Sequence, residues 1–500
     1  MNDNGLTCDL FDRIRALSCA ETWSLSSDKV QLRPSRMEAI FYASEGYSAL
    51  QAMLQSGFEI DLISNYAKVI WHGIQTRVFV RDDKYGIPYI NTSNMMEARP
   101  KPSLFLSKKA TKNLKKFIVY KGTILLSMSG SVGNLRLVDE DLDDWTATVD
   151  ALRVDTIDSN DLGPVYCYLQ SSLGQFLLQR SQTGSVVRHI YEADVSNLPI
   201  PRLPRRLRGE LTKRIQEVSN LRVEVNRLLN ETEWMIQQQL ELPDIEFFKA
   251  SRKTPLNHNA ITFAVRATDR IIGSNQFGRC RFDATHHDPA AVKLRDYLQE
   301  NKQAKKLLDI STKIWRSNLR QRVYVDEKSY GVPLLTGKHI SLIRFNNLNY
   351  LSKSYTKKIN HEMVNQGYVL VTCGGTIGKI MFVHRNMDGY AVSEDVLRVI
   401  PNVEHVYAGF VYAFLCSPYG QIQLTHEEYG SVQKKLRDFQ VGDILIPIPK
   451  DKGLSINQLI ITAFNKRADA LEKENAAFDL FMTAIREGRE ATEARWGSAE

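Results

Sequence analysis

The stretch GTILLSMSGSVG, Gly122–Gly133, has a close relative later in the same chain, GYVLVTCGGTIG, Gly367–Gly378. Each is a short run rich in Ile, Val and Leu that leads into a glycine turn edged with Ser and Thr. Such a pattern is typical of a β-strand followed by a tight turn. The two copies lie 245 residues apart. If this spacing reflects a duplication, the chain contains the same domain twice, and further similarity is expected at the same offset.

The same offset relates RVFVRDDKYGIPYI, Arg77–Ile90, to RVYVDEKSYGVPLL, Arg322–Leu335. Two Arg-Val pairs also share it. Further along, TGSVVRHI and YGSVQKKL are related at an offset of 246, and LPIP and IPIP at 248. Internal similarity at an almost constant spacing predicts that one structural unit occurs twice. Each unit mixes strand-like runs with short helical segments, so we expect an α+β domain.

A long amphipathic segment follows each of the two IPIP-like motifs. Apolar residues there recur at steps of three, four and seven, which predicts a helix with one buried face. These positions are Leu211, Ile215, Val218, Val225, Leu229 and Ile236 in the first segment, and Ile460, Ala463, Phe478 and Phe481 in the second. Polar breaks such as Arg222 and Arg467 interrupt the stripes. The simplest arrangement pairs the two helices, antiparallel and coiled-coil-like, through these stripes or in contact with a partner.

The expected architecture is therefore two pseudo-symmetric α+β domains separated by two long antiparallel helices. The boundaries are placed at 1–206 for the first domain with an N-terminal extension, 207–242 for the central helix, 243–452 for the second domain and 453–500 for the C-terminal helix. A helix of 34 residues is about 50 Å long. That length corresponds to roughly 15 base pairs of DNA.

The sequence lacks the motifs of several kinds of catalytic site. The second glycine turn has three residues, not four, between Gly374 and Gly378, and Ile380 stands where a nucleotide-binding loop needs a magnesium-holding hydroxyl. Neither copy has the dinucleotide fingerprint. The chain has no Pro-Pro, so it lacks the loop that amino-methyltransferases use. His286-His287-Asp288 is the densest set of metal-ligand types, but it occurs in one repeat only, and we interpret it as the start of a helix; no metal site is expected.

Basic residues gather beside the glycine-rich loops in both halves. The net charge of +8 is mild, but backbone N–H groups, hydroxyls and cationic side chains together favour phosphate contact. The candidate DNA-binding residues are Arg77, Arg81, Ser129, Ser131, Asn134, Arg188, Arg320, Arg322, Thr376, Lys379, Lys434 and Lys435. Each lysine or arginine in this set, taken singly, could also be an ordinary solvated surface residue.

The six cysteines form no CxxC pair, which argues against a disulfide framework and against a thiolate zinc site. The N-terminal segment carries acids where a secretory signal needs bases. No apolar run reaches the length of a membrane span. These features predict a cytoplasmic protein.

The order of these motifs resembles the specificity subunit of type I restriction-modification systems. Each half contains YG(I/V)P, an apolar strand into SGSVG or GGTIG, then GSV with basic residues, then (L/I)PIP, and finally a long helix. The stretch RFDATHHDP is similar to a segment often found ahead of target-recognition domains in that family. The resemblance covers almost the whole chain, although the region ahead of the first such domain is longer than a minimal subunit needs.

The resemblance implies a non-catalytic DNA reader of a phage-defence system. Each target-recognition domain would contact one half of a bipartite DNA sequence, and the helices would fix the gap and dock two methyltransferase subunits. S-adenosylmethionine, ATP and magnesium would reside on those partners and on a motor-nuclease subunit, and no cofactor would bind this chain. Two alternatives remain open: a DNA-reading component of another defence or modification assembly, and an enzyme with an unrecognised active site.

Overall fold

The computed structural model describes residues 44–73, 76–182, 188–252, 284–317, 321–345, 347–430 and 432–498. These residues fall into two compact units. The first takes the described residues up to Met95, Lys101–Ser219 and those from Lys473 onward. The second takes Met96–Pro100 and Asn220–Glu472. Both long helices contribute residues to both units.

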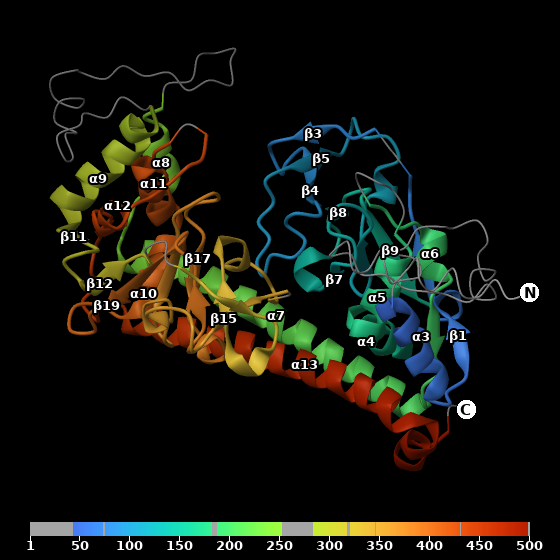
Figure 1. Cartoon of the computed structure of the whole chain (residues 1–500). Coiled ribbons are helices and arrows are strands. Elements are labelled where there is room, and N and C mark those ends of the chain that lie inside the picture. Colours follow the sequence, from blue (N-terminus) through green and yellow to red (C-terminus); the bar gives the residue numbers. More distant parts are fainter. Residues whose placement is uncertain are drawn as a thin grey trace, which may run out of the picture. The chain divides into compact units, whose positions relative to one another are not determined.

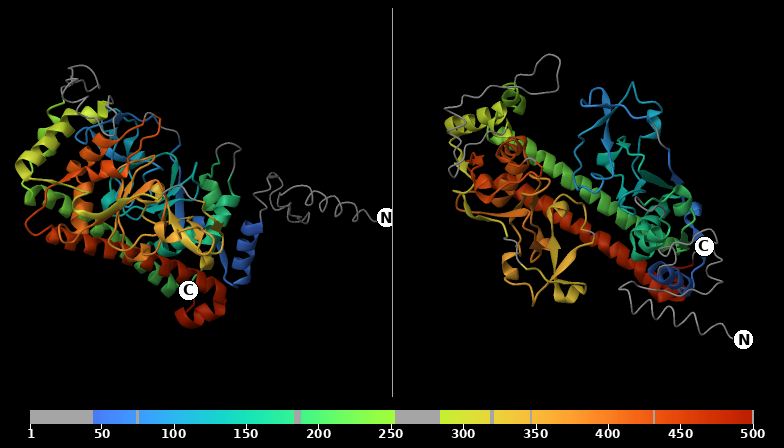
Figure 2. Two further views of the ribbon diagram at one scale, coloured as in Figure 1. Left: turned by 60° about the vertical axis from the view of Figure 1, so that its left-hand side comes forward. Right: turned by 45° about the horizontal axis from the view of Figure 1, so that its top comes forward.

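The first unit is built from short strands and helices, which Figures 1 and 2 show in blue to green. Its strands are β1 Ile60–Leu62, β2 Ala67–Ile70, β3 Phe79–Val80, β4 Gly86–Ile90, β5 Phe105–Ser107, β6 Ile124–Ser127, β7 Leu135–Leu137, β8 Thr146–Ala147, β9 Ala151–Thr156 and β10 Pro199–Pro201. Its helices are α3 Ser44–Gln55, α4 Leu162–Gln170, α5 Ser172–Arg180, α6 Glu192–Ser196, the start of α7 Arg205–Gln239 and the end of α13 Leu454–Trp496.

The second unit repeats this order of elements. Its strands are β11 Lys305–Lys306, β12 Ser311–Trp315, β13 Tyr324–Val325, β14 Gly331–Leu335, β15 Asn349–Ser352, β16 Val369–Thr372, β17 Ile380–Phe382, β18 Ala391–Val392, β19 Val396–Pro401 and β20 Leu445–Ile446. Its helices are the end of α7, α8 Ile245–Lys249, α9 Pro289–Lys302, α10 Ala408–Cys416, α11 Pro418–Glu427, α12 Asp438–Gly442 and the start of α13 Leu454–Trp496.

The sheets of the two units share one topology. A core sheet has the order β2-β9-β6-β7 in the first unit and β12-β19-β16-β17 in the second. A smaller sheet has the order β3-β5-β4-β8 and β13-β15-β14-β18, with one parallel pair in each, β4–β8 and β14–β18. A short pair, β1–β10 or β11–β20, completes each unit. The predicted duplication of an α+β domain is therefore confirmed.

A buried arginine occupies the same place in both core sheets. Arg153 on β9 donates from Nη2 to the carbonyl of Phe117 at 3.2 Å, and Arg398 on β19 donates to the equivalent carbonyl of Glu362 at 2.8 Å. Burial lowers the pKa of both guanidinium groups to about 10. These carbonyls lie ahead of β6 and β16, so each arginine bonds its core sheet to the segment that precedes the strand of the opening motif.

The two long helices run antiparallel. In the first unit Glu217 of α7 pairs with Lys473 of α13 at 2.7 Å, and in the second Gln239 bonds to Ser455 at 2.8 Å. Residues nearer the end of α7 thus meet residues nearer the start of α13. Helix α7 ends after Gln239 because Glu241 adopts a left-handed φ of 46° ahead of Pro243. The expected antiparallel pair of helices is present.

The helix stripes pack into the domain cores as well as toward each other. Leu211, Ile215 and Phe481 belong to the core of the first unit. Val225, Leu229, Ile236, Ile460 and Ala463 belong to the core of the second. Val218 is buried, and Phe478 is half-buried against the first core. The helices are therefore structural parts of each domain rather than separate linkers.

Each domain contacts the helix that follows it through a helical glycine. The amide of Gly163 on α4 donates to Thr212 Oγ1 on α7 at 2.9 Å. The amide of Gly409 on α10 donates to Asn457 Oδ1 on α13 at 2.8 Å. A Cβ at Gly163 would lie 2.2 Å from the backbone nitrogen of Thr212, and one at Gly409 would lie 2.6 Å from Asn457 Oδ1. Only glycine lets these helices approach so closely. Among the described residues, no helix has the length and apolar character needed to span a membrane.

Candidate nucleic-acid interface

The two glycine turns of the opening motif have the same local structure. Each connects two antiparallel strands, β6 to β7 and β16 to β17. Gly130 and Gly375 have φ values of 69° and 74°, a region that only glycine enters at little cost. From the following helix, Gln175 and Gln421 donate to the carbonyls of Gly133 and Gly378 at 2.9 and 3.0 Å. These two hydrogen bonds therefore fix the base of each turn, whereas the residues at its tip are exposed.

The candidate residues on these turns differ in exposure. Ser131 and Thr376 are exposed at the tips, whereas Ser129 and Asn134 are half-buried. Lys379 is engaged within the second unit, where its Nζ lies 2.6 Å from Glu97 Oε1 and 2.8 Å from Ser341 Oγ. The turn tips thus offer hydroxyl groups to solvent, and the ammonium group of Lys379 already has a carboxylate partner.

The candidate arginines also separate into exposed and paired groups. Arg81 and Arg188 are exposed. Arg77 donates to the hydroxyl of Tyr89 at 2.8 Å. Arg322 bridges Glu362 at 3.2 Å and Glu394 at 2.6 Å, with its side chain 12% exposed. An arginine held between two carboxylates supports the fold, whereas an exposed one can meet a phosphate. Arg320 lies outside the described residues.

The basic residues after the second GSV motif are exposed or nearly so. Lys434 pairs with Glu428 at 2.9 Å and keeps 42% of its side chain exposed. Lys435 is exposed, and its backbone pairs with Tyr429 through bonds of 2.8 and 3.0 Å. The same segment forms an isolated bridge between Gly374 and Lys435. This bridge places Lys435 beside the second glycine turn.

A basic and aromatic feature that the sequence interpretation missed lies on the smaller sheet of the first unit. We call it the first aromatic–lysine lobe; its exposed residues are Phe79, Tyr85, Lys108, Lys109, Lys112, Lys115 and Lys116. Tyr85 precedes β4, and its carbonyl accepts from the amide of Lys108 at 3.0 Å. Asn113, at φ 56°, bends the chain after β5. The lobe therefore presents aromatic rings and ammonium groups from one short strand pair and its turn.

The second unit has a matching second aromatic–lysine lobe, whose exposed residues are Tyr324, Tyr330, Tyr355, Lys353, Lys357 and Lys358. The carbonyl of Tyr330 accepts from the amide of Lys353 at 3.1 Å, the same bond as in the first lobe. Lys358, at φ 54°, takes the place of Asn113. The repeat SKKATKNLKK and SKSYTKKINH, at the 245-residue offset, was the signal that could have identified both lobes.

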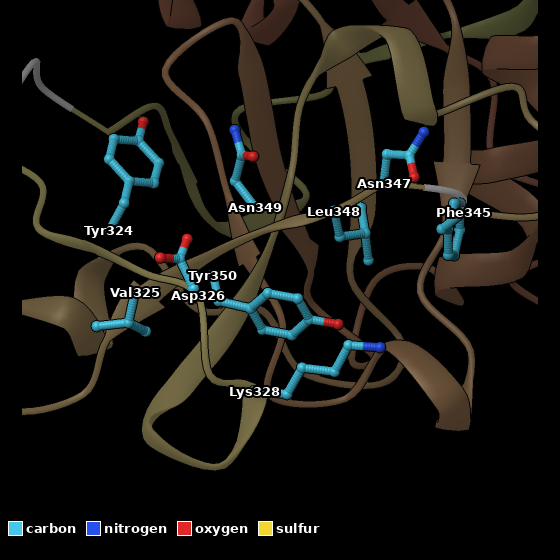
Figure 3. A pocket seen from close by; sticks show the side chains of 9 residues that line it. All are labelled: Tyr324, Val325, Asp326, Lys328, Phe345, Asn347, Leu348, Asn349 and Tyr350. Atoms are coloured by element: carbon cyan, nitrogen blue, oxygen red, sulfur yellow. The ribbon is translucent and has the colours of Figure 1, made fainter. Parts of the chain in front are cut away.

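The second lobe also forms an open pocket of about 480 Å³ (Figure 3). Its lining residues are Tyr324, Val325, Asp326, Lys328, Phe345, Asn347, Leu348, Asn349 and Tyr350. The ammonium group of Lys328 lies 5.9 Å from the centre of the Tyr350 ring. At the equivalent positions of the first repeat, Asn347, Asn349 and Tyr350 are replaced by proline, leucine and phenylalanine. The two lobes thus share two lysine positions, Lys108 with Lys353 and Lys112 with Lys357, but differ in the polar groups that line the pocket.

This arrangement suits contact with a nucleic acid. Lysine ammonium groups neutralise phosphates without reading the sequence, while amide side chains and aromatic rings can contact base edges.

Arg222 and Arg467, the two polar residues that interrupt the apolar stripes of the long helices, lie outside both lobes. Arg222 and Arg467 line one space of about 20 Å³ in the second unit, and Arg467 donates to the carbonyl of Leu342 at 2.6 Å. Burial lowers the pKa of Arg467 to about 10, with a smaller contribution from Arg222.

Comparison with known proteins identifies a family in two stretches of the chain. The family described as "Type I restriction modification DNA specificity domain" matches residues 75–205 and again residues 300–477, which together make up more than half of the chain. Both matches include an opening glycine turn and an aromatic–lysine lobe. No curated protein matches the sequence.

Solved structures of similar proteins match along most of their length. A type I restriction-modification system S subunit from M. genitalium is 13% identical, and the match covers 86% of this chain and 96% of that one, with a TM-score of 0.25. An HsdS subunit from Thermoanaerobacter tengcongensis is 12% identical, with 86% and 97% covered and a TM-score of 0.25. The family of this chain is shown by the two sequence matches, at residues 75–205 and 300–477, and not by these structures.

Proposed function

Because this chain belongs to the type I restriction-modification DNA specificity family and carries that domain twice, we propose that each copy reads one half of a bipartite DNA target. The chain is a DNA specificity subunit of a restriction-modification complex. The observation that supports one reader per half-site is the pair of aromatic–lysine lobes. They have the same strand order in two separate units and share lysines at two equivalent positions, Lys108 with Lys353 and Lys112 with Lys357.

The differences between the lobes support two different half-sites. Residues that contact phosphates can be the same in both copies because every DNA sequence presents the same backbone. Residues that contact base edges must differ if the half-sites differ. Asn347 and Asn349 line the pocket of the second lobe, where the first repeat has proline and leucine. In this proposal, asparagine side chains of the second lobe and the exposed turn tips Ser131 and Thr376 provide sequence-dependent contacts.

The paired helices are proposed to set the gap between the half-sites and to dock two methyltransferase subunits. Antiparallel helices rooted in two domain cores are suited to holding those domains at a set spacing. The chain itself is proposed to be non-catalytic. S-adenosylmethionine, ATP and magnesium are then assigned to the methyltransferase and motor-nuclease partners, and the reaction is methylation or cleavage of DNA that this chain has selected.

The experiment that tests the function maps methylated motifs in the genome of the native host, with and without the gene for this chain. Loss of one bipartite motif on deletion, and its return on complementation, is the expected result. A complementing gene that carries N347P and N349L should alter only one half of that motif. An unchanged set of methylated motifs after deletion would contradict the proposal. So would methylation by the purified chain without partners.

A further inference from the structure

A cluster of metal-ligand side chains lies in the second unit, away from the aromatic–lysine lobe. His286 belongs to a 3₁₀ turn, Ala284–His287, that directly precedes α9. His426 and Glu427 lie at the end of α11. All three side chains are buried, and each offers a ligand atom within 4.8 Å of the ligand atoms of the other two. Folding thus joins residues separated by about 140 positions in the sequence.

The neighbouring residue Asp288 has a structural role, as the sequence interpretation expected. Its carboxylate accepts from the amide of Ala290 and caps α9, and it also pairs with Arg252. His286 instead points toward α11. Its ring stacks on that of His426, with centroids 4.5 Å apart and an angle of 18° between the planes. Nε2 of His426 lies 3.7 Å from Glu427 Oε1.

The chemistry of the three donors selects a class of ion. Two imidazole nitrogens and one carboxylate oxygen form a common zinc ligand set, and the same set also binds cobalt and other late divalent ions. Donors on one tetrahedral zinc ion lie roughly 3.4 Å apart, as follows from bond lengths of about 2.0–2.1 Å. The observed separations are within about 1.5 Å of this value. A tilt of the two rings out of their stack would let both nitrogens face one ion.

The electrostatic setting of the cluster is mixed. Arg295 Nη1 lies 3.7 Å from Glu427 Oε1 and also donates to Gln423 Oε1 at 3.5 Å and to the carbonyl of Asp443 at 3.3 Å. Because Arg295 has these other acceptors, its guanidinium can remain in place while the carboxylate turns toward an ion. A divalent cation would then act as the nearer counter-charge of the buried carboxylate.

We propose that His286, His426 and Glu427 bind one divalent transition-metal ion of the zinc class. The ion would fasten the 3₁₀ turn ahead of α9 to the end of α11. The first repeat has Arg180 and Ser181 at the positions of His426 and Glu427, so the site belongs to the second repeat alone. The ion would therefore stabilise one domain and is separate from the DNA-reading lobes.

The test uses the purified full chain after dialysis against a chelator. Zinc is added against a chromogenic competitor, and cobalt is added while the visible d–d absorption of a tetrahedral site is recorded. The expected result is one equivalent of either ion and a rise in Tm on addition of zinc. H286Q and E427Q should each weaken binding at least about tenfold. His405 is exposed on the same unit, so H405Q serves as the matched control and should bind as the parent chain does.

Metal binding by the parent chain tests the proposal without any variant, so the test holds even if a variant fails to fold. Failure of the folded parent chain to bind zinc or cobalt near one equivalent would overturn the proposal. Equal affinity for parent, H286Q and H405Q would also overturn it, since the bound ion would then lie elsewhere. A loss of binding confined to H286Q and E427Q, with circular dichroism unchanged, supports it.

Discussion

Replacing three lysines of the first aromatic–lysine lobe, in the variant K112Q/K115Q/K116Q, should weaken DNA binding without changing its sequence preference. All three side chains are exposed on the turn that follows β5, and the nearest core residue, Phe117, stays as it is. The substitution removes three positive charges and keeps side chains of similar polarity. We therefore expect a folded protein whose electrostatic attraction to phosphates is reduced.

The size of the effect follows from counterion release. Each phosphate contact contributes about −0.9 to the slope of log K against log salt concentration. If all three lysines contact phosphates, the slope of the variant is smaller in magnitude by about 2.7. Between 50 and 200 mM salt, the parent complex should then lose roughly 40-fold more affinity than the variant complex. The ratio of affinities for target and scrambled DNA should stay the same, because phosphate contacts carry no sequence information.

The assay is fluorescence anisotropy with the assembled complex, on a duplex that contains the methylated motif and on a scrambled duplex of equal length. The matched control is K305Q/K450Q/K452Q, which removes three exposed lysines outside the lobes. An equal salt slope for the lobe variant and the control would refute the assignment of the lobe to DNA contact. A changed sequence preference in the lobe variant would refute the claim that these lysines meet only phosphates.

Four other outcomes are expected. G163A should lower the free energy of unfolding by about 1–3 kcal/mol in urea melts because its Cβ has no room beside α7, whereas G209A in the open part of that helix should be neutral or gain up to about 1 kcal/mol. N349L should reduce discrimination at one position of one half-site by about 1–3 kcal/mol in competition binding, and unaltered discrimination would contradict a base contact. Burial lowers the pKa of His384 to about 3, so as the pH falls below about 6.5 this imidazole takes up a proton in the unfolded chain but not in the folded one. Acidification therefore favours the unfolded chain. From pH 7 to pH 5 the free energy of unfolding of the parent should fall by about 2 kcal/mol more than that of H384Q. One heptad inserted into each long helix should lengthen the gap of the methylated motif by about 3 base pairs, which methylome mapping would detect.

Much of the fold could be predicted from the sequence because it is encoded by local pattern and repeated. The strands β6 and β16 follow from apolar runs bounded by glycines, and the long helices follow from stripes with helical spacing. The strands β3 and β13 have two residues each and are too short to show a hydrophobic period. The docking of the helices into the domain cores was also not predictable, since residues such as Leu211 and Ile460 look the same whether they face a partner helix or a core.

The candidate interface was predictable only in part. The glycine turns attracted attention because their glycines are required by backbone geometry, and positive φ values confirm that requirement at Gly130 and Gly375. Charge alone did not distinguish Arg322, which is held between two carboxylates, from the exposed Arg81. The lysines of the lobes were missed because they lie in ordinary-looking polar turns. The metal-ligand cluster depends on two segments that only folding brings together.

The glycine contacts of α4 with α7 and of α10 with α13 have a mechanical consequence. Close-packed backbone leaves no compressible layer between a domain and its helix, and dense packing passes strain on rather than absorbing it. Gly163 and Gly409 therefore act as stiff joints. Rotation of either helix would therefore be transmitted to the domain that packs against it, and with that domain to its aromatic–lysine lobe.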